Sequence, residues 1–162
     1  VLGIIRAFAR FALTHPEYCL ILAGRSEGAY ADLLKREAEK SGCADRIKFA
    51  GYRTDKELAY LYTRARALVY PSVIEGFGLP VLEAMQCGTA VITSASSSLP
   101  EVAGDAALLV DPTDTGAIAV AMERIAQDNT LRENLIRKGA RQAEKFSWDK
   151  TAREITDILH SL

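Results

Sequence analysis

Short, continuous apolar runs alternate along the chain with longer segments in which apolar residues recur every three or four positions. The runs predict buried strands of a parallel sheet, because each is brief and is soon followed by glycine or polar residues. The longer segments predict amphipathic helices, two of them preceded by the N-cap residues Thr54 and Ser147. We expect strands at Cys19–Ala23, Ile47–Ala50, Ala67–Tyr70, Ala90–Thr93 and Ala107–Val110. We expect helices at Leu2–Thr14, Ala29–Ser41, Asp55–Ala65, Pro80–Cys87, Thr115–Gln127, Leu131–Lys145 and Trp148–Leu162.

This order predicts an α/β fold in which residues 1–162 form one domain: a single Rossmann-like, doubly wound parallel sheet with helices on both faces. Such a domain normally opens with a strand, whereas this chain opens with the helix Leu2–Thr14. In the usual order the first strand lies between Cys19–Ala23 and Ala67–Tyr70. We therefore expect a gap in the sheet there, filled from elsewhere or left by truncation. Direct pairing of those two strands would contradict this expectation.

The composition excludes several classes of function. Hydrophobic residues make up 49% of the chain and charged residues 25%, which is ordinary for a globular protein. A net charge of -1 gives no general attraction to nucleic acid or to anionic membranes. No membrane span or signal peptide is visible. Cys19, Cys43 and Cys87 lack metal or disulfide spacing, so we expect free thiols and a cytoplasmic protein without a bound metal.

The candidate site is the segment EGFGLPVLE, Glu75–Glu83, which follows a predicted strand and leads into a predicted helix. Gly76 and Gly78 allow a sharp turn and the close approach of a ligand. Pro80 suits the first helical position, where its missing N–H costs nothing. The free N–H groups and the dipole of this helix start favour an anion, and Glu83 can accept hydrogen bonds from hydroxyl groups attached to it. The segment therefore predicts a site for a nucleotide diphosphate sugar.

Three further loops follow predicted strands and should gather at the same edge of the sheet. They supply weaker candidates, each of which is also compatible with an ordinary solvated loop residue. Arg25, Ser97 and Ser98 are candidate phosphate contacts, and Lys56 lies in the first turn of its helix near the second loop. The loops are Gly24–Gly28, Gly51–Asp55 and Ser94–Pro100.

The runs EGFGLPVLEAMQCGTAVITS and SSLPEVAGDAALLVDP closely resemble the nucleotide-sugar-binding half of the retaining glycosyltransferases of family 4 (group 1), which have the two-domain GT-B architecture. The similarity extends from LGIIRAF to FSWDKTA, nearly the whole chain. It implies a C-terminal domain that binds a GDP- or UDP-linked sugar, without a metal or cofactor. It also implies a preceding acceptor-binding domain, through which the enzyme could be peripheral to a membrane. That domain and the Arg and Lys that clamp the diphosphate lie outside these residues.

The resemblance implies a role for each matching residue. Glu75 is the candidate catalytic residue and contacts hydroxyls of the donor sugar, while Glu83 binds the ribose. The diphosphate is held at Gly76, Phe77, Gly78 and Leu79 through backbone N–H groups, and the base lies near Gly51, Tyr52 and Arg53. Ser96, Ser97 and Ser98 replace glycines found in many members, as in mannosyltransferases that build surface polysaccharides, which suggests GDP-mannose.

Three alternatives remain at this point. The chain could be a stand-alone nucleotide-sugar-binding subunit that pairs with a separate acceptor subunit. It could be a non-transferring GT-B relative such as an epimerase, but the predicted loops contain no histidine for the sugar. Two carboxylates also occur in glycoside hydrolases, where they flank one glycosidic bond, whereas Glu75 and Glu83 bracket an anion-binding turn.

Overall fold

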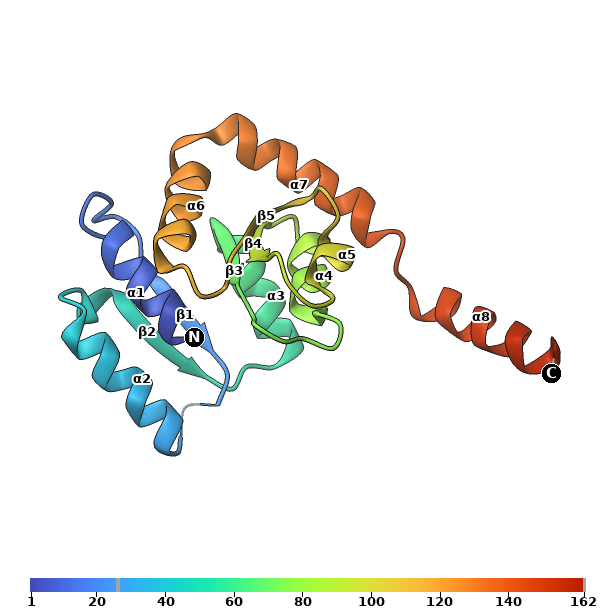
Figure 1. Cartoon of the computed structure of the whole chain (residues 1–162), viewed down its shortest axis with the longest axis horizontal. Helices are drawn as coiled ribbons and strands as arrows, with labels where there is room; N and C mark the ends of the chain where they lie inside the picture. The colour runs from blue at the N-terminus through green and yellow to red at the C-terminus, as the bar shows by residue number, and fades with distance from the viewer. Residues whose placement is uncertain (26, 162) are drawn as a thin grey trace.

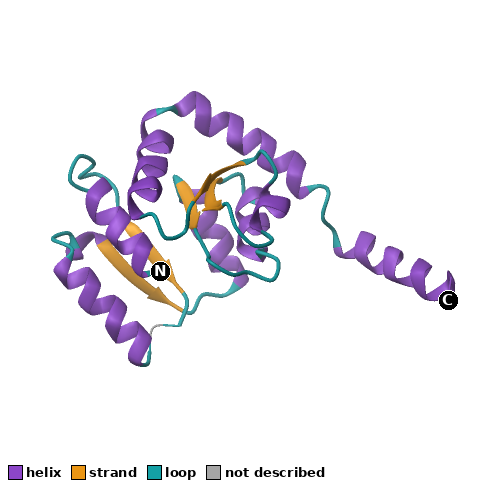
Figure 2. Cartoon of the chain, viewed as in Figure 1, coloured by secondary structure: helices purple, strands orange, loops and turns teal. Residues whose placement is uncertain are grey.

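Strands and helices alternate in the predicted order (Figure 1, Figure 2). The structure is a computed structural model that describes residues 1–25 and 27–161. The strands are β1 (Leu20–Ala23), β2 (Ile47–Gly51), β3 (Ala67–Tyr70), β4 (Ala90–Ser94) and β5 (Ala107–Val110). The helices are α1 (Leu2–Phe11), α2 (Ala29–Lys40), α3 (Asp55–Arg64), α4 (Leu79–Gln86), α5 (Leu99–Ala103), α6 (Thr115–Gln127), α7 (Asn129–Ala143) and α8 (Trp148–Ser161), with a 3-10 turn, η1, at Ala44–Arg46. The predicted α/β class is confirmed.

The parallel sheet is divided into two parts. β1 pairs with β2, and β4 lies between β3 and β5 in a second sheet. Within the described residues β1 does not pair with β3, so the pairing that would contradict a missing strand is not observed. The two sheets are separated at the position of the expected gap, because the described residues contain no strand that bridges β1 and β3.

Helices cover both faces of the larger sheet, and β4 shows how the two faces differ. Every residue of β4 is buried, as expected for a central parallel strand. Its side chains alternate between the faces. Ala90 and Ile92 belong to a core shared with α1, α2 and α6, whereas Val91 packs with α4 and α5.

The structure departs from the predicted elements in one further helix, α5, in the 3-10 turn η1 and at several helix boundaries. α5 was expected as loop, because its five residues, LPEVA, are too few to show a helical period. α4 starts at Leu79, so Pro80 occupies the second helical position rather than the first. α7 starts at Asn129 because the Asp128 side chain accepts a hydrogen bond from the N–H of Leu131. Leu162, the predicted last residue of the final helix, and Ser26, in a predicted loop, lie outside the described residues.

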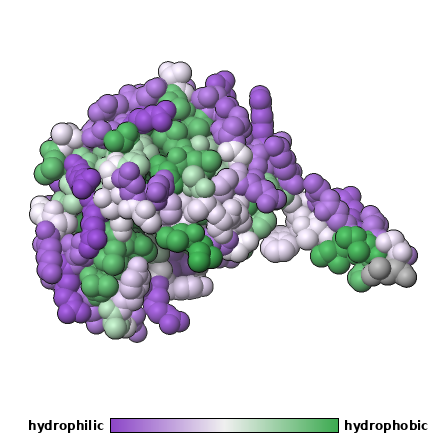
Figure 3. Space-filling view, viewed as in Figure 1, coloured by the Kyte–Doolittle hydropathy of each residue, from purple (hydrophilic) through white to green (hydrophobic). Residues whose placement is uncertain are grey.

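The last helix, α8, extends away from the body of the domain (Figure 1). All of its described side chains are exposed. Its apolar residues lie at helical spacing and form one stripe, which consists of Trp148, Ala152, Ile155, Ile158 and Leu159. Figure 3 shows hydrophobic surface gathered toward the far end of this helix. No helix in residues 1–25 and 27–161 is long and apolar enough to cross a bilayer.

The start of α3 is held by a capping box, which gives a testable prediction. The Thr54 hydroxyl accepts from the N–H of Glu57, and the Glu57 carboxylate accepts from the N–H of Thr54 at 2.9 Å. Replacing Thr54 by alanine should lower the free energy of unfolding by about 1 kcal/mol, measured by urea denaturation. Thr63→Ala, an exposed change on the same helix, is the control. Equal losses in the two variants would contradict the capping role.

Candidate functional site

The loop from β3 to α4 forms a corner with unpaired backbone donors. Gly78, the N-cap of α4, has a φ of 104° and is buried, a conformation that favours glycine. Within the described residues, the backbone N–H groups of Phe77, Gly78 and Leu79 donate no hydrogen bond. Phe77 and Leu79 are 42% and 48% exposed. Three consecutive unpaired donors at a helix start favour an anion.

Serines from the loop after β4 hold this corner in place. The Ser97 hydroxyl donates to the carbonyl of Glu75 at 2.7 Å and accepts from the N–H of Glu75 at 3.1 Å. The Ser98 hydroxyl lies 2.8 Å from the Glu75 carbonyl and 3.0 Å from that of Phe77. A hydroxyl carries one hydrogen, and in this structure both serines direct theirs at carbonyl groups of the loop. The two serines therefore brace the corner, and their contact with a phosphate stays a prediction.

The two candidate carboxylates each accept a hydrogen bond from a tyrosine. The Tyr70 hydroxyl, at the end of β3, donates to Glu75 at 2.7 Å. The Tyr62 hydroxyl, on α3, donates to Glu83 at 3.2 Å. Sequence reasoning missed both tyrosines, although Tyr70 directly precedes the loop as the last residue of its strand.

Burial raises the pKa values of both phenols, which are protonated at neutral pH even at their ordinary pKa. It raises the pKa of Tyr70 to about 12, with the neighbouring Glu75 carboxylate contributing in the same direction. Burial is also the main cause of the raised pKa of Tyr62, and the negative charge of Glu83 is the second cause. Loss of a proton would place a second negative charge beside each carboxylate, so both tyrosines remain hydrogen-bond donors at neutral pH.

The predicted base-binding loop follows β2. The N–H of Gly24 donates to the carbonyl of Gly51 at 2.9 Å, which joins the loops after β1 and β2. Tyr52 is 83% exposed and offers a free aromatic face. The Arg53 guanidinium is directed inward instead, to the Ala50 carbonyl and to Glu57 at 3.2 Å.

The remaining cationic candidates are Arg25 and Lys56, and both side chains are exposed. The structure thus joins the predicted loops in two pairs: those after β1 and β2, and those after β3 and β4. α3 connects the pairs, because it starts beside the base loop and carries Tyr62 against Glu83 on α4.

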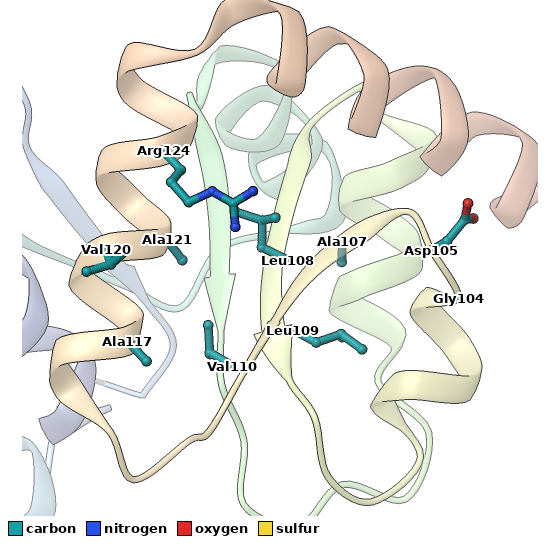
Figure 4. Close-up of a pocket in the computed structure, with 10 residues that line it drawn as sticks. All are labelled: Gly104, Asp105, Ala107, Leu108, Leu109, Val110, Ala117, Val120, Ala121 and Arg124. Atoms are coloured by element: carbon teal, nitrogen blue, oxygen red, sulfur yellow. The ribbon is translucent and has the colours of Figure 1, made fainter.

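A separate hollow of about 450 Å³ lies between β5 and α6 (Figure 4). It is lined mainly by apolar side chains such as Leu108 and Val120, with Arg124 reaching over it from α6. The hollow does not include the corner between β3 and α4. The corner is the candidate site because it combines unpaired N–H groups with a carboxylate on each side.

A corner with unpaired N–H groups at the carboxyl end of a parallel strand is the kind of position at which open α/β sheets bind ligands, and its donors favour an anion. The model of the family described as glycosyl transferases group 1 matches residues 1–142, and the chain belongs to that family. The family resemblance seen in EGFGLPVLE is therefore confirmed, as is the GT-B type of fold.

Three relatives illustrate the match. O-antigen chain mannosyltransferase B of Escherichia coli is 43% identical over 91% of this chain and 39% of its own. Sucrose-phosphate synthase from Thermosynechococcus elongatus is 30% identical, with a TM-score of 0.87 over 98% of this chain and 42% of its own. HepE of Anabaena, in complex with UDP and glucose, is 23% identical and shares the fold, with a TM-score of 0.89 over 99% of this chain and 44% of its own. The chain thus spans well under half the length of these relatives.

The shape of the corner gives a second prediction. A Cβ on Gly78 would lie 2.5 Å from Cδ2 of Leu99, in a φ region that L-residues avoid. Gly78→Ala should therefore lower the free energy of unfolding by about 2–3 kcal/mol in urea denaturation.

Gly76→Ala is the matched control in the same loop. No heavy atom lies within 4 Å of the position of its added Cβ, so its stability should change by at most about 0.5 kcal/mol. Similar losses in both variants would show that the corner does not depend on contact between Gly78 and Leu99.

Proposed function

We propose that this chain is the donor-binding half of a retaining glycosyltransferase, which transfers a sugar from a nucleotide diphosphate sugar to an acceptor. The observation that carries the proposal is the set of three unpaired N–H groups at Phe77, Gly78 and Leu79, between two carboxylates. Pyrophosphate oxygens accept such donors, and carboxylates accept hydrogen bonds from sugar hydroxyls.

Each proposed role corresponds to one part of the nucleotide sugar. The corner binds the diphosphate, Glu83 binds the ribose, and Glu75 binds hydroxyls of the donor sugar and acts at the reacting end. Tyr52, in the loop after β2, is placed to contact the base through its exposed ring. Arg53 supports that loop through the Ala50 carbonyl.

Relatives suggest the kind of donor. Two structures of HepE contain UDP with glucose, or UDP-glucose. Several curated relatives are mannosyltransferases, and one of them is 43% identical to this chain. Together with Ser96, Ser97 and Ser98 in place of glycines, this favours GDP-mannose over a UDP-linked donor for this chain.

A second domain is part of the proposal. The sheet is open between β1 and β3, and the apolar stripe of α8 has no cover within the described residues. The alignment with sucrose-phosphate synthase takes in 98% of this chain but 42% of the synthase, so most of that protein lies beyond the shared domain. We propose that a preceding acceptor-binding domain covers α8 and that the segment leading from it fills the gap in the sheet. Transfer then requires both walls of the cleft, which exclude water from the reaction.

Two of the alternatives receive less support. An epimerase would use histidines near the sugar, whereas His15 is buried, with its ring stacked on Phe11 at 4.3 Å, and His160 lies on α8. A stand-alone subunit would leave the stripe on α8 to a separate chain.

We assign the enzyme to the cytoplasm, because Cys19, Cys43 and Cys87 are free thiols, and assign any peripheral membrane contact to the preceding domain.

The ribose assignment is tested by Glu83→Ala in the complete enzyme. Because the variant lacks the charged carboxylate that accepts the ribose hydroxyls, its affinity for GDP or UDP, measured by calorimetry, should fall about tenfold or more. Gln86→Ala, exposed one turn further along α4, should bind with the affinity of the unaltered protein. Unchanged affinity in Glu83→Ala would refute the role of Glu83.

The stereochemistry is tested on the product. If the leaving phosphate assists an acceptor that attacks from the same face, the transferred sugar keeps the anomeric configuration of the donor. Proton NMR of the first product formed by the complete enzyme from an α-linked donor should therefore show an α linkage. A β linkage in that product would contradict retention.

A further inference from the structure

We propose that Tyr62 and Tyr70 are positioning residues for the donor, each holding one oxygen of a ligand-binding carboxylate so that the other oxygen faces the ligand. The inference rests on the proposed function and deepens it, because it assigns two residues that the family pattern in EGFGLPVLE does not contain. Tyr62 acts on the ribose through Glu83. Tyr70 acts on the donor sugar through Glu75.

Both tyrosines are anchored in the same way. The Tyr70 carbonyl accepts from the Thr93 hydroxyl at 2.9 Å, and the Tyr62 carbonyl accepts from the Thr89 hydroxyl at 2.6 Å. Both threonines are buried, at 0% and 2% exposure. Each phenol therefore projects from backbone that is fixed to the core at or beside β4.

The carboxylates are less constrained than the phenols that hold them. Glu83 is exposed, and Glu75 lies half-buried in the loop before α4. Within the described residues, neither side chain forms an ion pair with a lysine or an arginine. The hydrogen bonds from Tyr62 and Tyr70 end on Oε2 of their glutamates, so Oε1 of each stays available to a ligand hydroxyl.

This arrangement lowers the cost of binding. A free glutamate side chain loses rotamer freedom when it orients toward a ligand. A carboxylate that is already oriented has less to lose, and its remaining oxygen accepts a hydroxyl from a restricted direction. Loss of the phenol oxygen should then weaken the hydroxyl-specific part of binding and leave the phosphate part intact.

The four side chains also form one electrostatic group. The Glu83 charge contributes to the raised pKa of Tyr70, and Tyr70 contributes to that of Tyr62. Because burial is the main cause of both raised pKa values, the two phenols remain donors well above neutral pH. The effects of the variants below should therefore be the same at pH 6 and pH 8.

The experiment compares Tyr62→Phe and Tyr70→Phe in the complete enzyme, with Tyr60→Phe as control. Tyr60 lies on α3 with Tyr62, is 63% exposed, and its ring lies under the Arg64 guanidinium. The ligands are GDP, its 2′- and 3′-deoxy forms, and GDP-mannose, with UDP and UDP-glucose in parallel. Binding is measured by calorimetry, and kcat and KM are measured with the donor that supports transfer.

Tyr62→Phe should weaken binding of the ribonucleotide about fivefold to tenfold and leave the affinity of at least one deoxy form unchanged. Tyr70→Phe should leave the affinity for the free nucleotide diphosphate unchanged, weaken binding of the nucleotide sugar, and lower kcat about tenfold. Tyr60→Phe should change neither the affinity for any of these ligands nor kcat. A merely structural role would weaken all ligands together, which would overturn the inference.

Glu75→Gln and Glu83→Gln separate this inference from the proposed function. If Glu83→Gln abolishes the preference for ribose but Tyr62→Phe retains it, the positioning role falls and the function stands. If neither glutamate variant changes binding or transfer, the proposed function itself falls. When Tyr62→Phe is combined with Glu83→Gln, the loss of binding should equal that of the glutamate variant alone, and the same holds for Tyr70→Phe with Glu75→Gln. Additive losses of binding would overturn the inference, even where a single tyrosine variant is less stable.

Discussion

The contact between Gly78 and Leu99 is the constraint on which the candidate site depends. Gly78 adopts a φ of 104° so that the chain can leave the loop and enter α4, and Leu99 occupies the space that a Cβ would need. Leu99 is fully buried and begins α5, so the corner is built directly on the core. A backbone turn of this kind presents consecutive N–H groups without using any of them inside the protein.

Around that contact, side chains from three parts of the fold hold the loop. Ser97 and Ser98 bind its carbonyls from the loop after β4. Tyr70 binds the Glu75 side chain from β3, and the ring of Phe77 meets that of Phe146 at 5.7 Å just before α8. Each support comes from a different element, which explains why a loop with several exposed side chains can keep a defined shape.

Much of the fold follows from local patterns. β3, β5 and α6 have the bounds that periodicity predicts, and Thr54 caps α3 as expected. α5 escaped prediction because one short turn has no period, and its position depends on the packing of Leu99 and Val102. The division of the sheet agrees with the gap expected from the order of elements, since no strand of the described residues lies between β1 and β3.

For the site, the sequence by itself determined the corner, because glycine, proline and carboxylate at that spacing have few other uses between a strand and a helix. It also determined the family, through EGFGLPVLE and its neighbours. Only the tertiary structure decided which partners each side chain has. Ser97 and Ser98 turn toward loop carbonyls, and Tyr62 reaches Glu83 from another helix, 21 positions earlier in the chain. Such contacts depend on how α3, α4 and β4 pack together, and local spacing carries no information about distances between separate elements.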